Sequence, residues 1–331
     1  MRFLVAGVLA LAVLWGGWWF IGSNAESHAA RAFFAAQKAQ GRTADYSSLS
    51  VVGFPSRFDL TVNDIALGDP QTGVTWRAPF AQLLALSYNP YHFVVALPHS
   101  QTLETPAGRF TIASTRMEGS VTFVPGVAFA LNEVVGIVDR PTLTASLGWQ
   151  VGADKMSLAS RRVPGRKTAQ EIGLRIEGVR PDAALRARLD PAGIRPDAIR
   201  EVYLDAELDF DRVIDRHALN APPRPTGITV KDGHIAWGKM VLSVTGQVGI
   251  GATGVPDGKI DLRVQNWEGL PQILAGLGVI KQDLAPTVHN MLTELAKGSK
   301  DPNVIDLPLY FAKGWMSLGP LPLGPAPRIG G

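Results

Sequence analysis

Residues 201–211 alternate polar and apolar side chains without a break over eleven residues. Successive side chains of an extended chain point to opposite faces, so a period of two gives a strand with one buried face and one wet face. Residues 57–63 and 260–265 repeat the pattern. Strands of this kind are typical of antiparallel sheets, in which the two faces meet different surroundings. The alternation therefore predicts a protein built mainly from antiparallel β-sheet.

Turn residues and a small number of helical segments agree with this fold class. The chain has 35 glycines and 24 prolines among 331 residues, a share well above the average for soluble domains. Asp232-Gly233 stands between two short apolar runs and predicts a hairpin turn. Further strands are predicted at residues 91–97, 110–112, 121–124 and 305–311, and helices at 181–189, 270–277 and 284–297. We expect a mainly β fold with a few helices (α+β), in which helices cover one end of a large curved antiparallel β-sheet.

Residues 3–22 form a run of twenty residues without a charged or strongly polar side chain. A helix of this length spans about 30 Å, the thickness of the hydrocarbon core of a bilayer. Trp15, Trp18 and Trp19 come at the far end of the run, where indole rings favour the interface between membrane and water. We therefore expect a transmembrane signal anchor over residues 1–22. It would hold a single-pass protein in the inner membrane, with the bulk of the chain in the periplasm.

A cleavable signal peptide is the alternative interpretation of this run. Arg2 supplies a positive charge before the run, and Ser23-Asn24-Ala25 resembles a cleavage site with small residues. The apolar core of a signal peptide has about 7–15 residues, whereas this run is longer and ends in bulky aromatic side chains. These two differences favour the anchor.

Residues 23–42 are rich in alanine and have neither glycine nor proline before Gly41. Such a composition favours a helix. The membrane helix is therefore predicted to continue outward as a helical stalk, with Phe33 and Phe34 docking on the folded domain. Residues 43–331 then form a β-rich periplasmic domain.

Two charged segments bear on the organisation of that domain. The length of the chain allows one domain or two lobes. Residues 161–167 are basic and are interrupted by a Pro-Gly turn, so in the second case the two lobes would meet near residues 155–170. An acidic run shares the parity of one strand face, so we interpret it as a solvated face rather than as paired carboxylates for glycoside chemistry: Glu201, Asp205, Glu207, Asp209 and Asp211.

The motifs that usually carry catalysis or bind cofactors are missing from this sequence. The absence of cysteine excludes disulfides and thiolate chemistry, and the six histidines include no helical i, i+4 pair. Residues 249–254 match G-x-G-x-x-G, but a turn follows them instead of the helix that would hold a pyrophosphate. A net charge of +3 is too small for the basic face that nucleic acid requires. We expect no enzyme activity, no cofactor, no metal site and no nucleic-acid partner.

Several segments resemble an alphaproteobacterial envelope family known as domain of unknown function 2125. VGFPSRFDL at residues 52–60, WRAP at 76–79 and YNP at 88–90 carry the opening of the resemblance. LPLYF at 307–311 and LGPLPLGPAP at 318–327 carry its close. More distantly, the plan of one anchor and a long β-rich periplasmic domain is similar to AsmA-like proteins. That resemblance implies a role in envelope lipid homeostasis, and neither resemblance implies a catalytic residue.

Two functions follow for a non-enzymatic, membrane-anchored protein of this kind. In the first, acyl chains of phospholipid bind in an apolar β-groove lined by the rows Val202, Leu204, Ala206, Leu208, Phe210 and Ile260, Leu262, Val264. Such rows need a cover, because large bare apolar patches are uncommon on soluble surfaces. A closed sandwich with the rows inside is the alternative arrangement. In the second function, the β-domain is a structural or assembly module that docks other envelope proteins.

Overall fold

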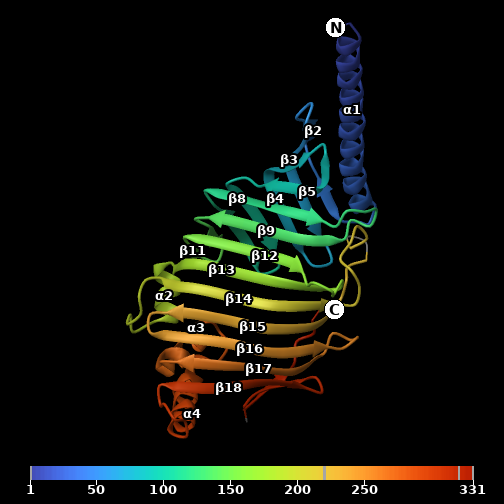
Figure 1. The fold of residues 1–331 in the computed structure, drawn as a ribbon. Helices are drawn as coiled ribbons and strands as arrows, with labels where there is room; N and C mark the ends of the chain where they lie inside the picture. Colours follow the sequence, from blue (N-terminus) through green and yellow to red (C-terminus); the bar gives the residue numbers. More distant parts are fainter. Residues whose placement is uncertain (1, 219–220, 320, 330–331) are drawn as a thin grey trace. The chain divides into compact units, whose positions relative to one another are not determined.

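The chain folds into two compact units. The computed structural model describes residues 2–218, 221–319 and 321–329, with side chains from residue 14 onward except that of residue 321. One unit comprises Met1–Pro125 and Val134–Gly148, and the other comprises Gly126–Glu133 and Trp149–Gly331. Both consist mainly of antiparallel strands (Figure 1), which confirms the prediction of a mainly β fold with a few helices.

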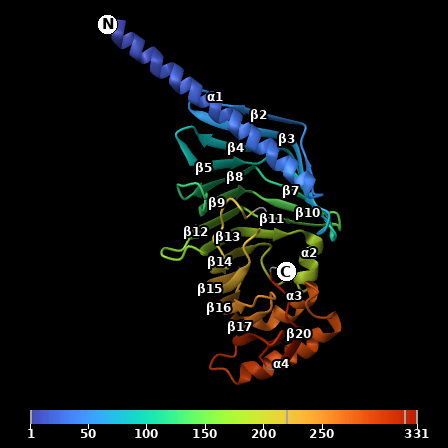
Figure 2. The same ribbon diagram turned by 90° about the vertical axis from the view of Figure 1, so that its right-hand side faces the viewer.

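The first unit begins with the long helix α1 (Arg2–Ala39), whose N-terminal turns extend beyond the strands of this unit (Figures 1 and 2). Its strands are β1 (Thr43–Asp45), β2 (Ser48–Val52), β3 (Arg57–Asp69), β4 (Val74–Leu86), β5 (Asn89–Ala96), β6 (Ser100–Thr105), β7 (Gly108–Ala113), β8 (Arg116–Phe123), the larger part of β9 (Leu131–Asp139) and β10 (Thr142–Ala145). β3 pairs with β1, β2 and β4, and β4 pairs with both β5 and β6.

The C-terminal half of α1 packs on β3. Phe34 is 5% exposed and lies in a core cluster with Ala44 and Leu60, against which Phe33 also packs. The predicted docking of the two phenylalanines is confirmed. The helix ends at Ala39, just before Gly41 adopts a φ of 76° that glycine accommodates easily.

The predicted anchor over residues 1–22 falls largely on residues 1–13, whose side chains lie outside the described part of the chain. Among the described residues, no helix combines the length and the apolar character that a membrane crossing needs.

In its described residues, the second unit is an antiparallel meander with three α-helices placed between its strands. Its elements are β11 (Trp149–Gly152), β12 (Lys155–Arg162), β13 (Ala169–Pro181), α2 (Ala183–Leu189), β14 (Ile199–Phe210), β15 (Pro225–Trp237), β16 (Met240–Ile250), β17 (Pro256–Gln265), α3 (Leu270–Gly276), α4 (Ala285–Lys297), β18 (Val304–Ala312), β19 (Trp315–Leu318) and β20 (Leu321–Pro325), with short 3-10 turns at Trp267–Gly269 and Gln282–Leu284. From β12 to β20 each strand pairs with the next strand along the chain.

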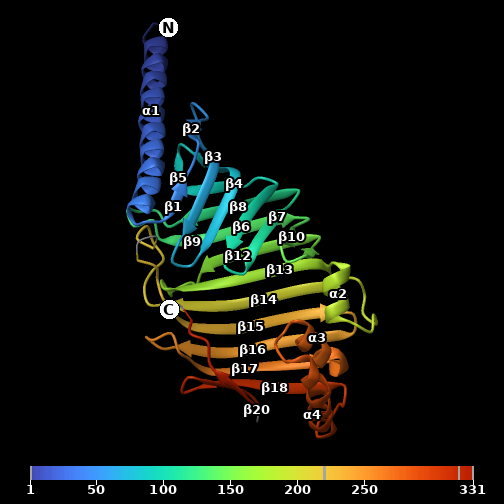
Figure 3. The ribbon, with the colours of Figure 1, turned by 180° about the vertical axis from the view of Figure 1, so that it is seen from behind.

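The three helices of this unit lie at the same end of its strands (Figure 3). They enclose a core in which Trp237, Val264 and Leu292 are almost fully buried. α2 begins at Ala183, two residues later than predicted, because Asp182 caps it by accepting a hydrogen bond from the backbone N of Leu185 at 2.8 Å.

The predicted hairpin turn at Asp232-Gly233 is wrong. β15 continues through both residues, and a register shift between Val230 and Gly233 marks an irregularity of the β-bulge type. The turn to β16 comes later, between the paired residues Trp237 and Met240. A glycine inside a strand often marks a bulge, so the local sequences of a bulge and a hairpin turn are alike.

The basic segment 161–167 lies within the second unit, where it closes β12 and leads into β13.

Candidate functional site

The two predicted apolar rows lie on one face of a single sheet. Val202 of β14 stands opposite Ile235 of β15, which stands opposite Leu242 of β16 and then Val264 of β17. Directly opposed residues of neighbouring strands share a face. β14 and β17 therefore contribute to the same apolar face of the second unit, with β15 and β16 between them.

α2, α3 and α4 cover one end of this face. Val264 is 1% exposed and belongs to the same core as Trp267 and Leu292, and Leu262 packs against that core. Two of the three predicted residues on β17 are therefore ordinary core, because helices lie over them. Ile260, at the other end of the row, is half-buried.

Beyond the helix-covered core, the same face is mainly apolar and partly exposed, and it also carries Ser160 and the buried Gln170, which share a hydrogen bond. Leu204 and Leu208 on β14 are half-buried, as are Leu174, Ile228 and Val244 on the nearby strands, and Leu158 on β12 is 37% exposed. We call this region the open apolar face; its residues are Leu158, Ile172, Leu174, Leu204, Leu208, Ile228, Val230, Val244 and Ile260. Of the other predicted lining residues, Ala206 is buried at 4% exposed, and half-buried Phe210 ends β14 opposite Pro225.

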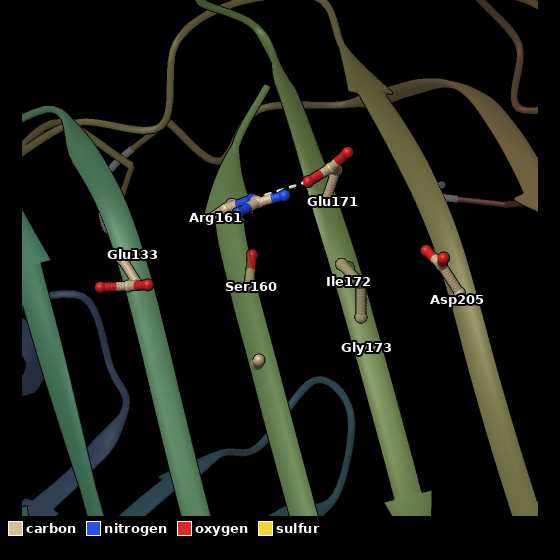
Figure 4. A pocket seen from close by; sticks show the side chains of 8 residues that line it. Glu133, Ser160, Arg161, Glu171, Ile172, Gly173 and Asp205 are labelled. Atoms are coloured by element: carbon tan, nitrogen blue, oxygen red, sulfur yellow. Dashed lines mark hydrogen bonds and ion pairs between the residues drawn. The ribbon is translucent and has the colours of Figure 1, made fainter. Parts of the chain in front are cut away.

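The opposite face of these strands is polar and carries a shallow cleft of about 310 Å³ (Figure 4). Gly173 lies between Ala159 and Asp205 of the neighbouring strands, so no side chain of β13 fills that position. The cleft is lined by Glu133, Ala159, Arg161, Glu171, Gly173 and Asp205, together with Ser160 and Ile172, whose register places their side chains on the open apolar face.

Ion pairs join several acidic groups of this polar face to cations of neighbouring strands and connections. The Nζ of Lys231 lies 3.0 Å from Glu171 and 3.4 Å from Glu207, and Nε of Arg161 lies 2.7 Å from Glu171. Hydrogen bonds from Lys231 and then from Arg161 hold the pKa of Glu171 below its usual range. Arg166 pairs with Glu207. Glu171 and Glu207 are thus paired with cations of adjoining segments instead of being only solvated. Two of these cations, Arg161 and Arg166, belong to the basic segment 161–167.

The histidines near these strands and helices take part in separate contacts. His234 lies 3.3 Å from the carboxylate of Glu201, and His289 on α4 lies with its ring centroid 5.5 Å from that of Trp267. Throughout the part of the chain that the structure describes, no group of three or more His, Asp or Glu side chains could hold a metal ion. The polar face is therefore best described as a ladder of ion pairs.

Sequence reasoning assigned no role to Glu26 of α1. Both of its carboxyl oxygens are buried without a hydrogen-bond partner in the described chain. Burial, followed by the charge of Asp59 on β3, raises the pKa of Glu26 to about 7. The signal in the sequence is an acidic side chain in the part of the helix that docks on the strands.

These features define a mainly antiparallel β protein with one sheet face that is partly covered by helices and partly open. A family model described as an uncharacterized protein conserved in bacteria (DUF2125) matches residues 18–327. The chain belongs to this family. No curated protein and no solved structure matches it.

Proposed function

We propose that this protein is a non-enzymatic, inner-membrane-anchored periplasmic protein of envelope biogenesis or lipid handling, which binds acyl chains on the open apolar face. The observation that carries the proposal is the continuity of this face with the helix-covered core. Leu204 and Val244 lie on the face that Val264 also occupies, yet they keep part of their surface exposed. An apolar ligand is the cover that such a surface favours.

The size and chemistry of the face suit a lipid chain. Six strands from β12 to β17, at a spacing of about 4.8 Å, extend the face over about 24 Å. Each CH₂ group that moves from water onto such a surface contributes about 0.8 kcal/mol. Half an acyl chain would therefore bind usefully without a polar contact.

The apolar run at residues 3–22 supports an anchor that keeps the second unit near its lipid source. The distant resemblance to AsmA-like proteins, whose larger members conduct phospholipids, agrees with this proposal. The partners that it implies are the inner membrane, phospholipid and other envelope proteins.

The test is lipid mass spectrometry on the detergent-extracted full chain and on a Leu204→Glu variant. A charge on the open apolar face should abolish lipid co-purification while the protein stays folded. Gln247→Glu is the matched control: it adds the same charge to the polar face of β16, opposite Lys259, and should leave co-purification unchanged.

Leu262→Glu, in contrast, should unfold the second unit, because Leu262 packs on the core. Unfolding by Leu204→Glu as well would show that the open apolar face is ordinary core. A folded protein without lipid, isolated together with other envelope proteins, would favour the assembly function instead.

A further inference from the structure

Exposed apolar side chains gather where the middle of α1 meets two connections of the first unit. The end of β2, the β2–β3 connection and the β4–β5 turn contribute one each, and α1 contributes the other three. We call these six residues, each between 43% and 66% exposed, the tip patch: Trp15, Trp18, Phe20, Val52, Phe54 and Tyr88.

Contacts between the helix and the two connections hold the tip patch together. The indole N–H of Trp15 donates to the backbone carbonyl of Pro55 at 2.9 Å, and that of Trp18 donates to the carbonyl of Ser87 at 3.4 Å. The rings of Phe20 and Phe54 lie 6.1 Å apart. The polar atoms of both indoles are thus satisfied inside the protein, while much of each ring remains exposed.

Neighbouring contacts fix the helix at this position. The indole N–H of Trp19, which is 7% exposed, donates to the carbonyl of Arg57 at 2.6 Å. The ring of Trp19 stacks on that of Phe58, and a Cβ at Gly22 would stand only 2.4 Å from the Phe58 ring. The close approach of α1 to β3 therefore depends on the glycine at this point.

We propose that the tip patch lies in the interfacial layer of the phospholipid bilayer. The proposal rests on the anchor of the proposed function, because the patch is continuous along α1 with the apolar run that begins at residue 3. The amphipathic rings of tryptophan and tyrosine favour this layer. The two connections of the first unit would then contact lipid, and the bilayer would hold this unit at a fixed depth instead of leaving it on a free tether.

The absence of cysteine from the chain allows single spin labels to be placed on the full-length protein. Phe54→Cys and Tyr88→Cys report on the tip patch. Leu147→Cys is the matched control, since Leu147 is 68% exposed in the same unit. It is close to Gly108, the first residue of β7. This is the end of the sheet where β3 and β4 pair through Asp69 and Val74, whereas the tip patch lies at the end where they pair through Arg57 and Leu86.

Each labelled protein is reconstituted into vesicles of phosphatidylethanolamine and phosphatidylglycerol. The ratio of oxygen to nickel-chelate accessibility should be several-fold higher at positions 54 and 88 than at position 147. Equal, water-like ratios at all three positions would overturn the proposal, as would a high ratio at position 147 or failure of the chain to float with the vesicles. The Leu204→Glu lipid assay is measured separately in detergent, so each of the two proposals can fail without the other.

Discussion

Gly233 on β15 lies directly opposite Leu204 on β14. A Cβ added at Gly233 would stand 3.5 Å from Cδ1 of Leu204 and equally far from Val230 and Val244. These are ordinary van der Waals distances. A methyl group therefore fits in the middle of the open apolar face without displacing its neighbours.

Gly233→Ala should accordingly raise the free energy of unfolding by about 0.4–1 kcal/mol, because alanine restricts the unfolded chain. Gly246→Ala on the next strand should lower it on the order of 1–3 kcal/mol. Gly246 has a φ of 139°, and its added Cβ would lie 2.4 Å from the carbonyl oxygen of Lys259. Urea unfolding of the wild type and both variants measures these changes in the free energy of unfolding. Changes of the same sign and size in the two variants would contradict the prediction.

Two leucines of the second unit should respond differently to truncation. Leu292 is 1% exposed in the helix-covered core, so Leu292→Ala should cost about 2–5 kcal/mol through lost burial and the cavity left behind. Leu204→Ala removes the same atoms from a half-buried position and should cost clearly less. Thermal or urea unfolding checks the order, and a larger loss at position 204 would argue that the open apolar face is closed core.

Asp190 and Arg195 form a buried ion pair before β14. The side chains of Asp190 and Arg195 are 1% and 10% exposed, respectively. The carboxylate of Asp190 accepts one hydrogen bond from Nη1 of Arg195 at 3.0 Å and another from the backbone N of Arg195 at 2.8 Å. Asp190→Ala should destabilise the protein by about 3–5 kcal/mol, because it leaves a buried cation unpaired. In the exposed pair Lys297–Glu294, Glu294→Ala should change stability by about 0.5 kcal/mol or less. Comparable losses of stability in both variants would show that burial does not determine how much an ion pair contributes to the stability of this protein.

Glu26 should make the first unit less stable as the pH rises. The pKa of this carboxyl is raised from 4.5 to about 7 by burial and by Asp59, so the folded protein binds the proton more tightly than the unfolded chain does. This contribution is fully present below pH 4.5 and is lost as the pH rises to about 7. Unfolding free energies measured across this range should fall in the wild type.

Glu26→Gln provides the control, since it keeps the size of the side chain and cannot ionise. Its stability should vary less over the same pH interval and should exceed that of the wild type at neutral pH. An identical pH dependence in the two proteins would assign the effect to other groups.

The strands were the most predictable part of the molecule. The alternation of polar and apolar residues predicted β14 and β17, because this pattern can be recognised in one strand without knowing which strands pair with it. Their place on one shared face depends on β15 and β16, whose register a single strand does not encode. The predicted hairpin at Asp232-Gly233 failed because a bulge inside a strand takes similar residues.

The site was less predictable because cover comes from distant segments. Leu204 and Leu262 look alike in their strands, and only the helices distinguish them: Leu262 packs against the helix-covered core and Leu204 does not. The same holds for Glu26, whose pKa is raised first by burial and then by the charge of Asp59 on β3. The cations that pair with Glu207 follow the same rule, since Arg166 lies 41 residues away in the chain.

The strand-by-strand pairing from β12 to β20 also has an evolutionary consequence. Because each strand in this series hydrogen-bonds to its immediate successor, gain or loss of one hairpin would widen or narrow the sheet by about 10 Å without rethreading the chain. The number of hairpins thus sets the width of the sheet. Chains of different length could therefore accommodate ligands of different size on the same architecture.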